Sequence, residues 1–228
     1  MSASVTSRPA RSKKAGIKTA EPPELDPSAN GEYCMAIVVV GGQSRNVGKT
    51  SLVANLIKAV PERPWTAVKI TQHEHDIPAD ASYVIREERE ASGDSDTARY
   101  LRAGARRALL LTARPGCLAD AIPALRRELG ADDVILESNS VLEFLEPDVY
   151  LAVLDPAIAD FKSSARQFLQ NASAVVLNEP ERHGIRWDKT LLDQVMRKPI
   201  FRVSPPHYLT ADLVEFVRKK LQSLDQRV

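Results

Sequence analysis

The 228-residue sequence has few cysteines, no excess of one charge and no long apolar run, and each absence narrows the protein classes it fits. Its 31 Lys and Arg balance 30 Asp and Glu, so charge favours neither a nucleic-acid nor a membrane partner. The two cysteines, Cys34 and Cys117, lie far apart in sequence, which favours small apolar residues in a reducing compartment over a disulfide or metal pair. No stretch approaches the length of a membrane-spanning helix. We therefore expect a cytoplasmic protein.

Residues 1–32 differ in composition from the remainder of the chain. They combine basic side chains with the segment Glu21-Pro22-Pro23-Glu24 and show little apolar periodicity. They also lack the apolar region that a secretory signal requires. We predict a disordered basic tail over residues 1–32 and one α/β domain over residues 33–228, which is long enough to bury a substantial core.

The most informative segment spans residues 36–52 and reads AIVVVGGQSRNVGKTSL. An apolar, β-branched run enters a glycine-containing loop, as a buried parallel strand would, and a helix-forming run follows over residues 51–60. This order predicts a phosphate-binding loop, whose glycines let the backbone amides turn inward and whose helix N-terminus adds partial positive charge. The residues expected to contact a nucleotide are Gly42, Gln43, Ser44, Arg45, Asn46, Val47, Gly48, Lys49, Thr50 and Ser51.

Within this loop, Lys49 is placed to reach the β- and γ-phosphates and the hydroxyl of Thr50 to bind Mg²⁺. The usual motif is GxxxxGK[ST], but its first glycine position is occupied by Gln43. Gly42 instead precedes Gly48 with five residues between them. This longer loop resembles the dethiobiotin synthetase branch of P-loop proteins.

Apolar strands alternate with amphipathic helices along the chain after this loop. Strands are predicted at 36–40, 65–70, 107–112, 133–137, 149–154, 174–177 and 200–203, and helices at 51–60, 97–103, 118–129, 159–170, 189–197 and 211–224. Residues 71–95 show no clear periodicity and form an unusually long connection, which indicates a functional or mobile segment. The alternation predicts an α/β fold with a mostly parallel central sheet and helices on both faces, the P-loop NTPase fold.

Polar residues at the carboxyl ends of these strands are the candidate site residues, because ligands bind there in parallel sheets. Glu137 ends the apolar run Val134-Ile135-Leu136, the arrangement of a Walker B acid, and is predicted to serve Mg²⁺ together with Thr50. Ser138 and Asn139 follow it and would lie near the phosphates or a substrate. His73 and His75 alternate after the second strand, where they either contact a ligand or are surface residues.

Two further strand ends carry candidates. Lys162 offers a second cation to the phosphates and Asp160 a partner for it, although a solvated helix start explains both residues equally well. Asn178 either hydrogen-bonds the edge of a purine base or is a turn residue before Pro180.

The chain resembles the MobB-like family, the molybdopterin-guanine dinucleotide biosynthesis adaptor proteins, over residues 35–180. That family places a lysine- and histidine-containing segment after the P-loop and then an acidic helix that runs into Ala-Gly-Ala. The corresponding residues here are Lys69, His73, His75, Asp76, Asp96-Thr97-Ala98-Arg99 and Ala103-Gly104-Ala105. The family's Val-Glu-Gly is replaced by Leu136-Glu137-Ser138.

The resemblance implies GTP binding with Mg²⁺, slow hydrolysis, a homodimer in many members and a partner enzyme that carries out nucleotidyl transfer. Lys49, Glu137 and Arg99 would then be the catalytic residues, with Arg99 either stabilising transferred charge or pairing with Asp96. The residues themselves leave the choice between GTP and ATP open.

Two other functions compete with this one. An ATP-dependent ligase resembling dethiobiotin synthetase, which activates a small-molecule carboxylate, is favoured by the five-residue spacer of the loop. An interaction protein with a loop that no longer binds nucleotide is disfavoured by the intact Lys49, Thr50 and Glu137.

Overall fold

The computed structural model describes residues 35–179 and 186–226, over which strands and helices alternate. The strands are β1 (Ile37–Gly42), β2 (Thr66–Gln72), β3 (Tyr83–Glu87), β4 (Arg107–Ala113), β5 (Val134–Glu137), β6 (Val149–Leu154), β7 (Ala174–Asn178) and β8 (Ile200–Val203). The helices are α1 (Lys49–Ala59), α2 (Asp96–Arg102), α3 (Leu118–Leu129), α4 (Ser163–Phe168), α5 (Lys189–Met196) and α6 (Ala211–Asp225). Short 3-10 turns cover Ser140–Glu143 and Leu169–Asn171.

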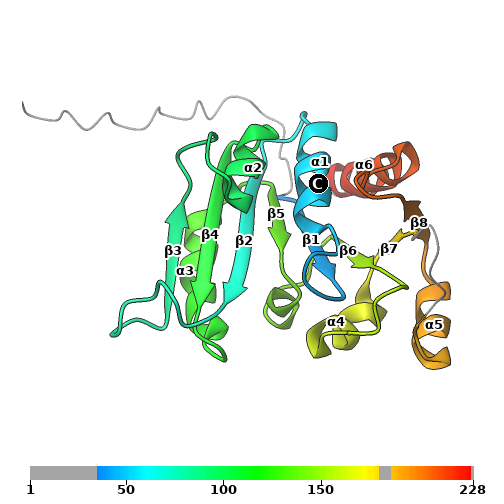
Figure 1. Ribbon diagram of the computed structural model, residues 1–228. Helices are drawn as coiled ribbons and strands as arrows, with labels where there is room; N and C mark the ends of the chain where they lie inside the picture. Colours follow the sequence, from blue (N-terminus) through cyan, green and yellow to red (C-terminus); the bar gives the residue numbers. More distant parts are fainter. Residues whose placement is uncertain (1–34, 180–185, 227–228) are drawn as a thin grey trace, which may run out of the picture. The chain divides into compact units, whose positions relative to one another are not determined.

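The eight strands form one sheet in the order β3-β4-β2-β5-β1-β6-β7-β8 (Figure 1). Every neighbouring pair is parallel except β3 and β4, which are antiparallel. The predicted α/β fold with a mostly parallel central sheet is therefore confirmed. Strand β1 lies between β5 and β6, so the loop that leaves its carboxyl end is flanked by the ends of both neighbours.

Side chains of β1 alternate between the two faces of the sheet, as a strand buried on both sides requires. Val38 and Val40 pack in one apolar cluster and Val39 in the other. The first cluster contains side chains of α1, α2 and α6, and the second contains side chains of α3, α4 and α5. Helices therefore cover both faces, as predicted.

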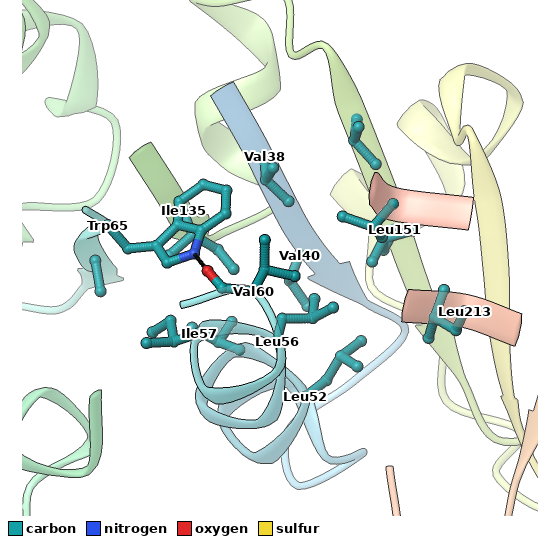
Figure 2. Close-up of a cluster of buried hydrophobic side chains, with 14 of the residues drawn as sticks. Val38, Val40, Leu52, Leu56, Ile57, Val60, Trp65, Ile135, Leu151 and Leu213 are labelled. Carbon is teal, nitrogen blue, oxygen red and sulfur yellow. Dashed lines mark hydrogen bonds between the residues drawn. The ribbon is translucent and has the colours of Figure 1, made fainter. Parts of the chain in front are cut away.

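Helix α1, which follows the phosphate-binding loop, packs on the sheet through an apolar stripe. Leu52, Leu56 and Ile57 are buried against the sheet (Figure 2). The indole of Trp65 packs beside them and donates a hydrogen bond from Nε1 to the carbonyl of Val60 at 3.0 Å. This bond satisfies the polar edge of an otherwise buried ring.

Side-chain caps begin three of the helices. Ser95 accepts a hydrogen bond from the amide of Ala98 at the start of α2. Asp188 caps α5 and Thr210 caps α6 in the same way, which satisfies amides that have no partner within the helix.

Two elements differ from the sequence prediction. Residues 71–95 contain the strand β3, whose weak pattern comes from its edge position, where Arg86 and Glu87 are exposed. The helix predicted over 159–170 begins only at Ser163, because residues before it extend along the phosphate-binding loop.

The predicted tail, residues 1–32, and Cys34 lie outside the described residues. Cys117 is a free thiol of intermediate exposure that precedes α3. Within the described ranges, the helices are all too short or too polar to cross a membrane.

The packing of α1 on the sheet predicts a large stability loss when its stripe is truncated. We expect Leu56→Ala to lower the free energy of unfolding by about 2–5 kcal/mol, because the side chain is 2 % exposed and a cavity would remain. Met196→Ala is the control, since Met196 is 60 % exposed and its change should stay within about 0.5 kcal/mol. Urea denaturation measures both, and equal losses would contradict the assignment of this core.

Candidate functional site

The loop between β1 and α1 lies at the carboxyl end of the sheet's central strand. Parallel sheets bind ligands at this edge, where the chain leaves β1 between two neighbouring strands. A cavity of about 840 Å³ opens there, within the size range of small-molecule sites. Residues of the loop, of β2, of β5 and of α2 line this cavity.

Close contacts explain the glycines of the loop. Gly48 has φ +99°, and a Cβ on it would lie 2.0 Å from the ring of Tyr208. A Cβ on Gly42 would lie 2.8 Å from the Cδ atom of Lys49, whose stem packs across it. Both positions therefore require glycine, and the tip between them carries Asn46 in a left-handed conformation with φ +60°.

The ammonium of Lys49 folds back across the loop. Its Nζ donates a hydrogen bond to the carbonyl of Ser44 at 2.7 Å. Burial lowers the pKa of Lys49 to about 8, a shift that Glu137 opposes and that the like charges of Lys162 and Lys69 increase. An anionic ligand beside this ammonium would favour its charged form, which is the electrostatic property expected of a phosphate site.

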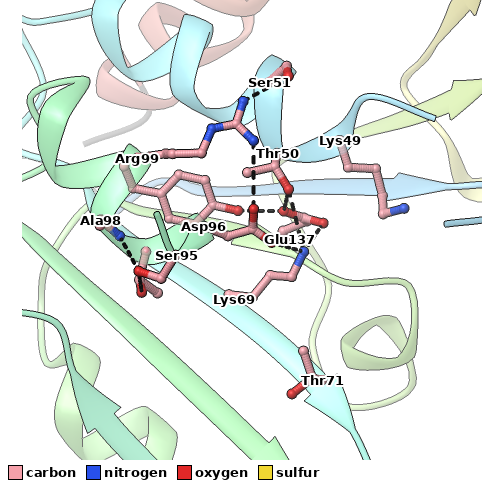
Figure 3. Close-up of polar contacts among 12 residues, drawn as sticks. Lys49, Thr50, Ser51, Lys69, Thr71, Ser95, Asp96, Ala98, Arg99 and Glu137 are labelled. Carbon is pink, nitrogen blue, oxygen red and sulfur yellow. Dashed lines mark hydrogen bonds and ion pairs between the residues drawn. The ribbon is translucent and has the colours of Figure 1, made fainter. Parts of the chain in front are cut away.

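Glu137 is the centre of a buried cluster at the end of β5 (Figure 3). Its side chain is 3 % exposed and accepts hydrogen bonds from Thr50 Oγ1 at 2.7 Å, from Tyr100 and from Lys69. Burial and the adjacent carboxylate raise the pKa of Tyr100 well above its usual value, so the phenol stays a donor. Three donors thus hold one carboxylate against the first turn of α1.

The pair formed by Thr50 and Glu137 fits the oxygen ligands that Mg²⁺ takes in nucleotide sites. Such sites use one or two protein oxygens together with phosphate oxygens. Within residues 35–179 and 186–226, His, Cys, Asp and Glu side chains form no group of three or more that suits a metal ion. Any Mg²⁺ would therefore take its remaining ligands from the nucleotide and from water. The metal role of Thr50 and Glu137 stays a prediction.

Helix α2 contributes further charged side chains, Asp96 and Arg99, beside α1. Asp96 forms an ion pair with Lys69 at 3.0 Å, and Arg99 lies 3.7 Å from the same carboxylate. Arg99 also donates a hydrogen bond to the hydroxyl of Ser51 at 3.0 Å (Figure 3). Arg99 borders the cavity and is tied to α1, and its catalytic role stays a prediction.

Asn139 and Asn178 both hold the loop. Asn139 accepts a hydrogen bond from the amide of Gly42 at 2.9 Å and donates one to its carbonyl at 2.8 Å. Asn178 is buried and donates to the carbonyl of Val47 at 3.1 Å. Its role toward a purine base stays a prediction.

The remaining predicted residues fall on two sides of the cavity. Arg45 and Asn46 lie exposed at the tip of the loop and border the cavity, whereas the side chain of Gln43 is buried and turns toward the segment after β6. His73 also borders the cavity, and its ring centroid lies 6.2 Å from that of His75.

Sequence analysis missed two aromatic residues of this site. Tyr208 packs on Gly48 from the loop after β8, and its position beyond a strand end was the available signal. Tyr100 lies within α2, where its spacing is that of an ordinary core residue.

Comparisons with known proteins return structural likenesses only. No model of a known protein family matches the sequence. No curated protein matches it either. The solved structures that resemble this chain include the hydrogenase maturation factor HypB from Archaeoglobus fulgidus, a MobB protein homolog from Bacillus stearothermophilus and LpxK from Aquifex aeolicus in complex with ATP.

These likenesses are weak. HypB is 12 % identical, with a TM-score of 0.46 over 82 % of this chain and 90 % of that one. The MobB homolog is 19 % identical, with a TM-score of 0.42 over 83 % and 99 %. LpxK is 17 % identical, with a TM-score of 0.45 over 74 % and 53 %. They assign neither a family nor a ligand to this chain.

The chain's own geometry carries the fold assignment. The central parallel strand β1 leads into a glycine-containing loop, and α1 follows this loop directly. Lys49, the first residue of α1, folds back across the loop. The chain therefore has the P-loop NTPase fold.

The close approach of Asn139 to β1 predicts that glycine is required at position 41. A Cβ there would lie 2.1 Å from the side-chain oxygen of Asn139 and 2.8 Å from the ring of Tyr150. We expect Gly41→Ala to lower the free energy of unfolding by about 1–3 kcal/mol, through overpacking. Gly93→Ala is the matched control, because a Cβ on Gly93 would lie 3.7 Å from its nearest neighbour, the Cβ of Ala98. Equal urea midpoints for the two variants would contradict this packing.

Proposed function

We propose that residues 33–228 form a P-loop NTPase domain that binds a nucleoside triphosphate with Mg²⁺, GTP in preference to ATP, and hydrolyses it slowly. The observation that carries this proposal is the ammonium of Lys49, which lies across a glycine-containing loop at the N-terminus of an 11-residue helix. A lysine ammonium, the backbone amides of a loop and the N-terminus of the helix that follows it together recognise phosphate groups.

Each residue of the site has a distinct role in this proposal. Lys49 and the loop amides bind the phosphates, and Thr50 and Glu137 hold Mg²⁺, which supplies charge neutralisation when bound. Lys69 and Tyr100 keep Glu137 oriented toward Thr50.

The donors around Glu137 support slow hydrolysis. The carboxylate of Glu137 accepts hydrogen bonds from a lysine, a phenol and a hydroxyl, so its oxygens are occupied by protein donors and are not free to accept a proton from an attacking water. Phosphoryl transfer depends mainly on positioning and electrostatic stabilisation. We therefore expect the site to bind the triphosphate and to hydrolyse it slowly.

The resemblance to the MobB-like family supports the finer part of the proposal. Its lysine, histidine and acidic-helix residues meet here in one place, since Lys69 pairs with Asp96 and His73 borders the same cavity. We therefore propose a role in the biosynthesis of the molybdenum cofactor's guanine dinucleotide form, as an adaptor to a partner enzyme that carries out nucleotidyl transfer. A homodimer and a cytoplasmic location belong to the same proposal.

The shape of the cavity favours one second candidate, an ATP-dependent ligase that activates a small-molecule carboxylate. Beyond the loop, the cavity continues along Thr71, His73, Ser138 and Ser140, which leaves room for an acceptor molecule. A rise in hydrolysis upon addition of a small carboxylic acid would favour this candidate.

Calorimetric titration with GTP and with ATP, each with Mg²⁺, tests the binding proposal. We expect Lys49→Ala to abolish measurable binding, because each charge-assisted hydrogen bond to a phosphate contributes about 1.5–3 kcal/mol. Lys58→Ala is the control, since Lys58 is exposed in the last turn of the same helix. Unchanged affinity in Lys49→Ala would refute the assignment of the loop.

Glu137→Gln separates binding from turnover. The amide keeps the size of the side chain and can still accept hydrogen bonds, but it loses the charge that would serve Mg²⁺. We expect triphosphate binding to persist and phosphate release to fall by a factor of about 10² or more. Phosphate release at the wild-type rate would remove Glu137 from the mechanism.

A further inference from the structure

Gln43 stands where the usual motif has its first glycine, and every polar group it carries has a partner. Its backbone amide donates to the carbonyl of Val153 at 3.0 Å, at the end of β6. Its backbone carbonyl accepts a hydrogen bond from the amide of Lys162 at 2.9 Å. The residue is fully buried, at 0 % exposure. The loop is therefore joined to both ends of the connection between β6 and α4.

The side-chain amide of Gln43 bonds to the middle of that same connection. Its Oε1 accepts from the amide of Asp155 at 2.9 Å. Its Nε2 donates to the carbonyls of Ile158 at 2.6 Å and Asp160 at 3.0 Å. A glycine has no group that could make these bonds, so Gln43 does here what the usual loop residue cannot.

These bonds fix the course of residues 155–162. Loss of the glutamine side chain would remove a partner from the amide of Asp155 and from the carbonyl of Asp160, whereas the carbonyl of Ile158 would keep the hydrogen bond that it accepts from Nε1 of Trp187 at 3.2 Å. The segment therefore lies along the phosphate-binding loop and does not begin α4 early, which is why that helix starts at Ser163.

Lys162 ends this fixed segment at the border of the cavity. Its backbone amide is bonded to Gln43, and its side chain is exposed. Lys49 and Thr50 line the same cavity, so the ammonium groups of Lys49 and Lys162 border one space.

Two other cations that border the cavity, Lys69 and Arg99, are already bound to protein groups, whereas Arg45, exposed at the tip of the loop, forms no ion pair within the described ranges. Lys69 pairs with Glu137 and Asp96, and Arg99 bonds to Ser51. None of the ion pairs found within residues 35–179 and 186–226 involves Lys162, so its charge is available to a ligand.

We propose that Lys162 binds the terminal phosphate of a nucleoside triphosphate and that Gln43 is the positioning residue that places it there. This inference rests on the triphosphate binding proposed above. It goes further because it assigns the preference for triphosphate over diphosphate to Lys162 and Gln43. A second cation near the mouth of the cavity favours the ligand with more charge at that end.

The test compares affinities for GTP and GDP, and for ATP and ADP, each with Mg²⁺, by calorimetry on the full chain. We expect Lys162→Met to weaken triphosphate binding on the order of tenfold while diphosphate binding changes about twofold or less. Lys162→Arg should keep the preference for triphosphate, because it keeps the charge. Lys58→Met is the control for removal of a lysine, since Lys58 is exposed on α1 and should change neither affinity.

Gln43→Gly, which restores the usual motif residue, tests the positioning role. We expect it to reduce the preference for triphosphate as Lys162→Met does. The double variant should lose no more than either single variant, because both act through one contact.

The outcomes separate this inference from the proposed function. If the wild-type chain binds no nucleotide, both are overturned. If it binds triphosphate and Lys162→Met keeps the full preference over diphosphate, only the role of Lys162 is overturned. If the losses in Gln43→Gly and Lys162→Met add in the double variant, Gln43 does not act through Lys162. Lys162 lies at an exposed position, so its variant remains informative even where Gln43→Gly does not fold.

Discussion

The burial of Glu137 beside the first turn of α1 is the constraint on which the rest of the site depends. A carboxylate that is 3 % exposed requires donors, and Thr50, Lys69 and Tyr100 supply them. Those donors come from α1, β2 and α2, so one charge fixes three elements relative to the end of β5. The phosphate-binding loop starts and ends within this framework, with β1 on one side and α1 on the other.

The positive charge of the cavity depends on which of its lysines have an acidic partner. Lys69 is neutralised by acidic partners, whereas Lys49 is held by a carbonyl and has a pKa lowered by burial. Uncompensated positive charge thus collects around the loop, and a polyphosphate is the ligand class that removes it with the least rearrangement. Gln43 and Asn139 keep the loop in this shape by tying it to the connections after β6 and β5.

The sequence predicted the fold and the loop because both signals are local. The run before Gly41, the Gly48-Lys49-Thr50 triplet and the alternation of strands and helices are each readable within a short window. The role of Gln43 was not predictable, since its partners lie 115 and 117 residues away along the chain. Strand β3 was missed because an edge strand with exposed Arg86 has little periodicity. Such long-range contacts and edge positions leave no local pattern.

Amide hydrogen exchange of the full chain, with and without Mg²⁺ and GTP or ATP, tests the central claim most directly. Amides that bind phosphate exchange slowly while the ligand is present, because closed and bound states are populated at the expense of open ones. The account predicts strong protection over residues 42–52 and weaker protection over residues 155–162, with little change in α5. Unchanged amide exchange in the loop at saturating nucleotide, or protection confined to another region, would contradict the account.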